Sequence, residues 1–178
     1  ISNLLSSWMD VDDLDKDMAF FKLRSSTNDT AVVTDVKDGN FMYASVDDKL
    51  IRPVVDRDLI FGEDSSLNYP IHFMSHNLEE ITKSPQVTSN KIPCGFIPIK
   101  KTIKPGETLR LNVVMVHVAS NEFLYEFVNR AKSNAYFDHK GKEARQLIDT
   151  LIEDVSSNTN FPIFDEYIKQ NYLDNLLR

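Results

Sequence analysis

The residues best suited to chemistry are four carboxylates grouped between positions 56 and 64. They are Asp56, Asp58, Glu63 and Asp64. Paired carboxylates serve glycosidic bond chemistry as general acid, general base or nucleophile. This group lies in a predicted loop, however, where acidic side chains commonly face solvent or cap turns. We therefore expect no catalytic residue here, and a small hydrolase built on these carboxylates is the least favoured of three functional classes.

Tyr69 follows the carboxylates and adds an aromatic ring to the same loop. Aromatic faces suit the C–H faces of sugar rings, although such residues often serve as half-buried packing. Together with Asp56 and Arg57, Tyr69 forms the predicted substrate-binding set for a sugar. We expect it to act in binding and not in catalysis.

Histidine and cysteine give weaker signals. His72 and His76 are four residues apart, but no Glu stands beside His72 and the flanking sequence does not favour a helix, so no metal site is predicted. Cys94 has no basic neighbour that would lower its pKa, which favours a packing role over a nucleophile. The chain holds no phosphate-binding glycine loop, and we expect no cofactor.

Charge and composition exclude several classes of partner. The chain has 178 residues, 20 basic and 27 acidic, with a formal net charge of −7. This balance disfavours nucleic acid and anionic membranes, which select for clustered Lys and Arg. No apolar run approaches the roughly 20 residues that a membrane-spanning helix needs. The single cysteine fits a reducing compartment, and a cytoplasmic location is expected.

The hydrophobic pattern changes at Ser120. Alternating, strand-like segments run up to Ala119, and helical spacing follows from Ser120 to Arg178. We therefore predict a mainly β protein with C-terminal helices: an antiparallel β-sandwich over residues 1–119 and an α-helical linker over residues 120–178. The predicted strands are 18–24, 30–36, 41–45, 49–55, 59–61, 71–74, 91–102 and 108–118.

The strongest local signal lies between the last two strands. Pro105 and Gly106 occupy the positions that a type II turn requires, so residues 91–102 and 108–118 are expected to pair with each other. Alternation weakens towards Val118, which predicts a strand buried between two sheets. Ser120 is expected to cap the first helix, a regular stripe over residues 144–155 predicts the second, and Pro162 suits the first turn of the third.

Several motifs carry a resemblance to a known family. They are the run Asp56-Arg57-Asp58-Leu59-Ile60-Phe61-Gly62, then Pro70, then Pro93-Cys94-Gly95-Phe96, and then Lys104-Pro105-Gly106-Glu107 before an apolar strand. In this order, over roughly residues 17–132, they resemble the N-terminal domain of glycoside hydrolase family 94. That family contains the cellobiose and related disaccharide phosphorylases and the cyclic β-1,2-glucan synthases.

The resemblance implies a β-super-sandwich, linker helices, and an (α/α)6 barrel that carries the general acid and the phosphate site. The helical pattern runs to Arg178 and the chain begins at Ile1, so we interpret it as a piece of a longer protein. Its main partner would be the helical barrel of the parent chain, with an oligosaccharide and a homodimer as further candidates. The alternative is a free-standing β-sandwich module that binds carbohydrate or protein.

Overall fold

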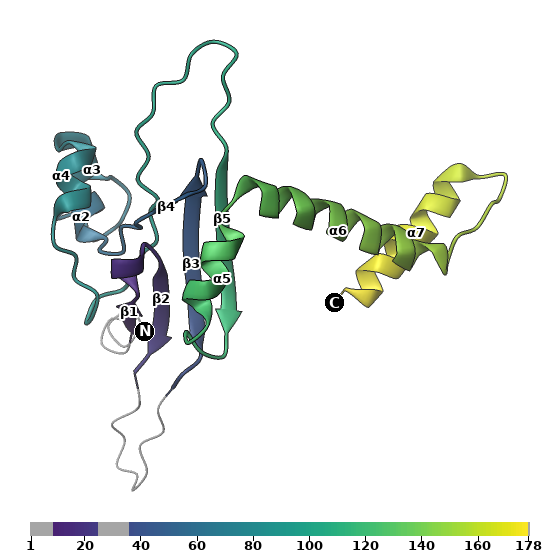
Figure 1. Ribbon diagram of the computed structural model, residues 1–178, viewed down its shortest axis with the longest axis horizontal. Helices are drawn as coiled ribbons and strands as arrows, with labels where there is room; N and C mark the ends of the chain where they lie inside the picture. Colours follow the sequence, from purple (N-terminus) through teal and green to yellow (C-terminus); the bar gives the residue numbers. More distant parts are fainter. Residues whose placement is uncertain (1–8, 25–35, 178) are drawn as a thin grey trace, which may run out of the picture. The chain divides into compact units, whose positions relative to one another are not determined.

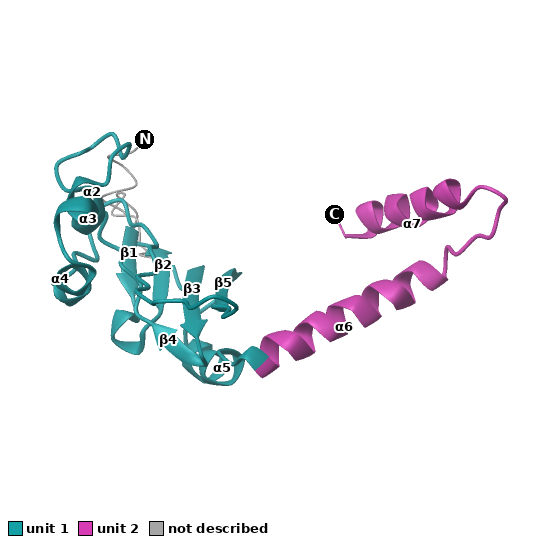
Figure 2. Ribbon diagram, turned by 90° about the horizontal axis from the view of Figure 1, so that it is seen from above, with its two compact units in different colours: residues 1–134 teal, residues 135–178 magenta. Residues whose placement is uncertain are grey.

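The structure is a computed structural model that describes residues 9–24 and 36–177. The chain divides into two compact units, residues 1–134 and residues 135–178 (Figure 2). The first unit contains the strands and the second contains the two longest helices.

The first unit is built on one antiparallel sheet of five strands (Figure 1). The strands are β1 (Met9–Asp12), β2 (Ala19–Leu23), β3 (Gly39–Val46), β4 (Lys49–Ile51) and β5 (Leu111–Val118). β3 is central: β2 and β4 pair with its two halves along one side, and β5 pairs with its full length along the other. The described residues thus confirm antiparallel strands followed by helices, but they form a single open sheet and not the two sheets of the predicted sandwich.

The turn between β3 and β4 explains why these strands form a hairpin. Asp47 and Asp48 both have positive φ, 50° and 63°. The type I′ hairpin turn needs positive φ at both central residues, and aspartate tolerates this region better than most residues. Most of the predicted strand 30–36 lies outside the described residues, whereas the predicted strands 18–24 and 41–45 are confirmed as β2 and β3.

Helix α5 (Leu124–Ala131) covers one face of the sheet. The hydroxyl of Tyr43 donates a hydrogen bond to the carbonyl of Ala131 at 2.8 Å, and Ser45 donates to the carbonyl of Lys132 at 2.6 Å. Phe41 meets Phe127 edge to face. Side chains alternate along a strand, so Phe41, Tyr43 and Ser45 share the face that α5 covers. This helix begins at Leu124 and not directly after Ser120, and it belongs to the first unit.

The opposite face of the sheet is covered only in part. A short 3-10 helix, η1 (Leu14–Lys16), contributes Leu14 to a buried cluster with Val11, Ala19 and Val55. Along β5, by contrast, Leu111, Val113 and Met115 are exposed. The prediction that this strand lies buried between two sheets is therefore wrong, because in the described part of the chain β5 forms an edge.

Two predicted strands are helical. Residues 59–61 belong to α2 (Asp58–Phe61), and residues 71–74 belong to α3 (Ile71–Ser75). Apolar runs of three or four residues do not distinguish the two states by periodicity. A third short helix, α4 (Leu78–Lys83), begins at a capping box in which Asn77 and Glu80 bind each other's backbone. The prediction that helices begin only at Ser120 therefore misses these three α-helices and the 3-10 helix η1.

Residues 91–102 form no strand and do not pair with residues 108–118. In the described part of the chain, an isolated bridge between Phe96 and Val54 is their ladder contact. Pro93 and Pro98 lack the N–H group that a ladder requires, which opposes an extended strand here. The predicted turn is confirmed: Glu107 N–H donates to the Lys104 carbonyl at 3.0 Å, and Gly106 has φ +84°.

The second unit holds two helices, α6 (Asn134–Glu153) and α7 (Pro162–Leu176). Pro162 begins α7, as predicted. Asp165 accepts hydrogen bonds from the hydroxyl of Ser157 at 2.6 Å and from the N–H of Thr159, and so fastens the loop between the helices. No helix in the described residues is long and apolar enough to cross a membrane.

Candidate functional site

Asp56, the central residue of the predicted binding set, has a structural role. Its side chain is 4% exposed and accepts hydrogen bonds from the N–H groups of Val87 and Asp58 and from Lys91 Nζ. These bonds fasten the segment before Lys91 to the chain that leaves β4. A carboxylate with its lone pairs engaged in this way has little capacity left for a ligand.

Lys91 joins Asp56 to Asp58, with Nζ at 3.0 Å from one carboxylate and 2.7 Å from the other. Arg57 Nε lies 3.5 Å from the second Asp58 oxygen. The first two acidic residues therefore converge on a cation and not on an open cleft. This arrangement gives no support to the acid and base pair of a glycoside hydrolase.

Tyr69 is exposed, and its backbone belongs to a separate loop held by Asp64. The Asp64 carboxylate accepts hydrogen bonds from the N–H groups of Ser66, Asn68 and Tyr69 and from the Ser66 hydroxyl. The hydrogen bonds of Asp56 and of Tyr69 run to different partners, so the two residues are held in separate networks. The Tyr69 ring faces solvent and remains a candidate sugar contact.

The loop held by Asp64 should become less stable in acid. The Ser66 hydroxyl, with the Tyr69 N–H next, holds the pKa of Asp64 below its usual 3.8. The pKa of this carboxyl is lower in the folded than in the unfolded chain. Its ionised form therefore stabilises the fold in full at any pH above the unfolded-state pKa, and this stabilisation is lost as the pH falls through the folded-state pKa. We expect Asp64→Ala to have a lower free energy of unfolding than the native chain at pH 6. The difference between the two free energies should become smaller below pH 3.8.

Urea unfolding of both proteins between about pH 6 and about pH 2 measures this difference. Glu63→Ala, which removes the neighbouring carboxylate, is the control. A difference that stays constant across the range would show that the Asp64 charge does not hold the loop.

His72 lies on α3, contrary to the expectation of non-helical sequence, and His76 directly follows the helix as its C-cap residue. The rings of His72 and His76 have centroids 3.8 Å apart, and His72 Nδ1 lies 3.1 Å from the Leu59 carbonyl. A metal site needs more ligands than two rings. In residues 9–24 and 36–177 no three His, Cys, Asp or Glu side chains are grouped so that they could hold a metal ion.

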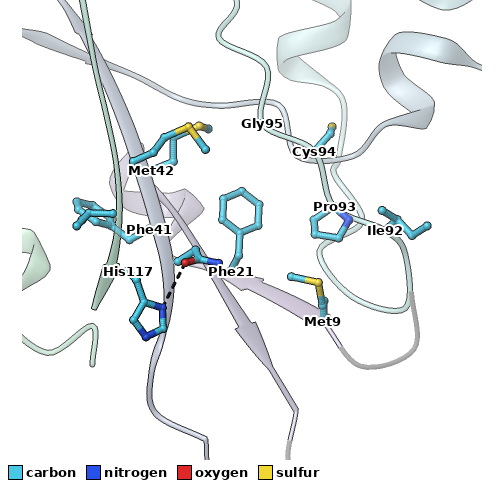
Figure 3. Close-up of a pocket in the computed structure, with 12 residues that line it drawn as sticks. Met9, Phe21, Phe41, Met42, Ile92, Pro93, Cys94, Gly95 and His117 are labelled. Atoms are coloured by element: carbon cyan, nitrogen blue, oxygen red, sulfur yellow. Dashed lines mark hydrogen bonds between the residues drawn. The ribbon is translucent and has the colours of Figure 1, made fainter. Parts of the chain in front are cut away.

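A cavity in the first unit lies on the sheet face opposite α5. It has a volume of about 530 Å³, and it is bounded by the strands on one side and by residues 92–95 on the other (Figure 3). Met9, Phe21, Met42 and Met115 line it from β1, β2, β3 and β5. Its walls are mostly apolar.

Polar groups gather at one end of this cavity. His117 Nδ1 lies 3.3 Å from Asn40 Oδ1, and His117 Nε2 lies 3.5 Å from Asp38 Oδ2. Asn40 and His117 are direct partners in the β3 and β5 ladder, so the sheet register places them together. An apolar cavity of a few hundred cubic ångströms with a few polar groups at one edge has the form of a small-molecule site.

The Cys94 thiol lines the cavity but is not activated. Burial, followed by the charge of Asp56, raises the pKa of Cys94 to about 12. Its sulfur lies 3.5 Å from the Val54 carbonyl. Thiol nucleophiles need the opposite shift, so the predicted packing role agrees with this environment.

Native Cys94 should therefore alkylate slowly. A pKa raised from 9.0 to about 12 lowers the thiolate fraction at pH 8 by roughly a thousandfold, because each pKa unit is a factor of ten. We expect iodoacetamide modification, followed by mass spectrometry, to be faster by about that factor in denaturing urea. A native rate within about tenfold of the unfolded rate would contradict the inert thiol.

Patterns in the sequence indicated some of the lining residues singly, but they did not predict the cavity. Residues 91–102 carry alternating apolar positions and were predicted to form a strand, whereas residues 92–95 of this segment line the cavity on the side opposite the sheet. Met9, Met42 and Met115 lie far apart in the chain and share one sheet face only through the pairing of β1 with β2, of β2 with β3 and of β3 with β5. Comparison with protein-family models, with curated proteins and with solved structures gave no match.

Proposed function

We propose that the chain is the non-catalytic β-domain and helical linker of a larger carbohydrate-active enzyme similar to the family 94 phosphorylases. In this role it would support an (α/α)6 catalytic barrel, and the parent would act in the cytoplasm. The proposal rests on the motifs between Asp56 and Glu107 and on one structural observation, the exposed apolar surface of the second unit.

The helices of that unit present apolar side chains to solvent. Ile163 is 87% exposed, Tyr167 62% and Leu147 58%. The described side chains of α6 and α7 include one buried residue, Asp165, and it is polar. Large exposed apolar areas mark interaction surfaces. A helical linker packed against a barrel would cover such side chains.

The bare part of the sheet supports the same role. Leu111, Val113 and Met115 lie exposed on one face of β5. An exposed apolar strand at a sheet edge is a template for pairing with further strands. Additional strands of a super-sandwich, contributed by the parent chain, would pair with this edge beside Leu111 and Val113.

The test begins with the reading frame on either side of Ile1 and Arg178, followed by assay of the complete protein. We expect the complete protein to convert a β-linked disaccharide and inorganic phosphate into a sugar 1-phosphate and a monosaccharide, and residues 1–178 alone to be inactive. A frame that encodes no helical barrel would overturn the proposal. In that case, oligosaccharide binding by residues 1–178 would favour the free-standing carbohydrate-binding module.

A further inference from the structure

The cavity on the open face of the sheet is lined by several methionine side chains. Three of the five methionines of the chain line it: Met9 from β1, Met42 from β3 and Met115 from β5. Met42 and Met115 are direct ladder partners, so their side chains stand next to each other on the same face. The sheet register therefore fixes this grouping, although the three residues are distant in sequence.

The methionine lining of the cavity favours an aromatic ligand. Methionine sulfur makes favourable contacts with aromatic rings, and its flexible side chain adapts to irregular ligands. Phe21 adds an aromatic ring to the same wall, between the positions of Met42 and Pro93 in Figure 3. A flat aromatic ring matches this lining better than a sugar ring, whose hydroxyl groups would each need a polar partner.

The polar end supplies a small number of such partners. Asn40 and His117 line one side of the cavity, and Asp38 lies next to His117 outside the lining, so donors and acceptors are both present at this side. The side chains of His117 and Asp38 are 62% and 57% exposed, so this end faces solvent. One hydrogen-bonding group on a ligand is enough to orient it, with its ring among the methionines and its polar group at the mouth.

We infer that this cavity binds a small planar aromatic compound that carries one hydrogen-bonding group. The inference depends on the first unit alone and is independent of the proposed role in a glycoside phosphorylase. The ligand inferred for this sheet face is thus an aromatic compound and not a sugar.

The methionine methyl groups report on the site directly. We would label the full chain with [ε-13C]methionine, assign the five methyl signals with single Met→Leu variants, and titrate with 2-naphthol. Ring currents from a bound naphthol should shift the signals of Met9, Met42 and Met115. Met18, which is 1% exposed, and Met74, which is 63% exposed on α3, serve as internal controls and should not move.

A pair of lysine variants separates the cavity from the surrounding apolar surface. Met115 and Val113 lie two residues apart on the same face of β5 and are 73% and 44% exposed, but only Met115 lines the cavity. Neither substitution removes a buried side chain, so both variants should fold. We expect Met115→Lys to weaken naphthol binding at least about tenfold, and Val113→Lys to leave it within about twofold.

Other outcomes would overturn the inference. Absence of shifts up to the solubility limit of 2-naphthol would show that the cavity does not take an aromatic ligand. Shifts at Met74, or equal loss of binding in both lysine variants, would indicate adsorption to exposed apolar surface. Shifts of the three methyl groups with cellobiose at the same concentration would assign the cavity to sugar.

Discussion

Gly39→Ala should be severely destabilised, because a methyl group at this position collides with the backbone of the neighbouring strand. A Cβ atom on Gly39 would lie 2.5 Å from the carbonyl oxygen of Phe21 and 2.8 Å from the Phe20 ring. Gly39 begins β3 and pairs with both Lys22 and Val118, so the strands on its two sides prevent it from moving away. We expect a loss of more than about 3 kcal/mol in the free energy of unfolding, measured by urea titration.

Gly95→Ala is the matched control. Its Cβ would meet the Met42 side chain, at 2.8 Å from Cε and 3.0 Å from Sδ. The end of a methionine can move where a backbone carbonyl cannot, so the loss should stay below about 1.5 kcal/mol. Similar losses in the two variants would contradict the close approach of β2 and β3 at Gly39.

Asp56→Ala should have the second largest effect. The substitution leaves the N–H of Val87 without its partner and removes one of the two carboxylates that bind Lys91. Loss of one partner from a buried, hydrogen-bonded charge network is costly, since the remaining groups lose their compensation for desolvation. We expect the free energy of unfolding to fall by about 3 kcal/mol.

Asp58→Ala tests whether the large loss of stability expected for Asp56→Ala comes from the burial of the Asp56 carboxylate. Asp58 contacts the same Lys91 at 2.7 Å, but its side chain is 47% exposed. Exposed ion pairs contribute about 0–1 kcal/mol, so this variant should lose no more than that. If Asp56→Ala were as stable as Asp58→Ala, the Asp56 carboxylate would again be a candidate for ligand contact.

The sequence predicted those parts of the fold that depend on local patterns. β2, the greater part of β3, the turn at Pro105 and Gly106, and the start of α7 at Pro162 are all confirmed. Each is determined by residues within a few positions of one another. The helices α2 and α3 were predicted as strands because their apolar runs are too short to show a period.

Pairing between distant segments could not be predicted. The partner of β5 is β3, about 70 positions earlier, and not the segment across the Pro105 turn. The same limit applies to the candidate site. Asp56 and Tyr69 are close in sequence but are held by different networks, while Asn40 and His117 are distant in sequence and meet across the ladder. Carboxylate density alone does not distinguish a binding site from a buried ion cluster.

The central position of β3 has a consequence for the order in which the chain can fold. Its hairpin with β4 closes through two residues, whereas its pairing with β5 must wait until the intervening residues 52–110 have been arranged. Contacts between distant segments slow folding, because a long loop must close before they form. During synthesis, the edge of β3 that pairs with β5, which includes the backbone of Phe41 and Tyr43, therefore stays unpaired until residues 111–118 have left the ribosome. An uncovered apolar strand of this kind is where misassembly begins.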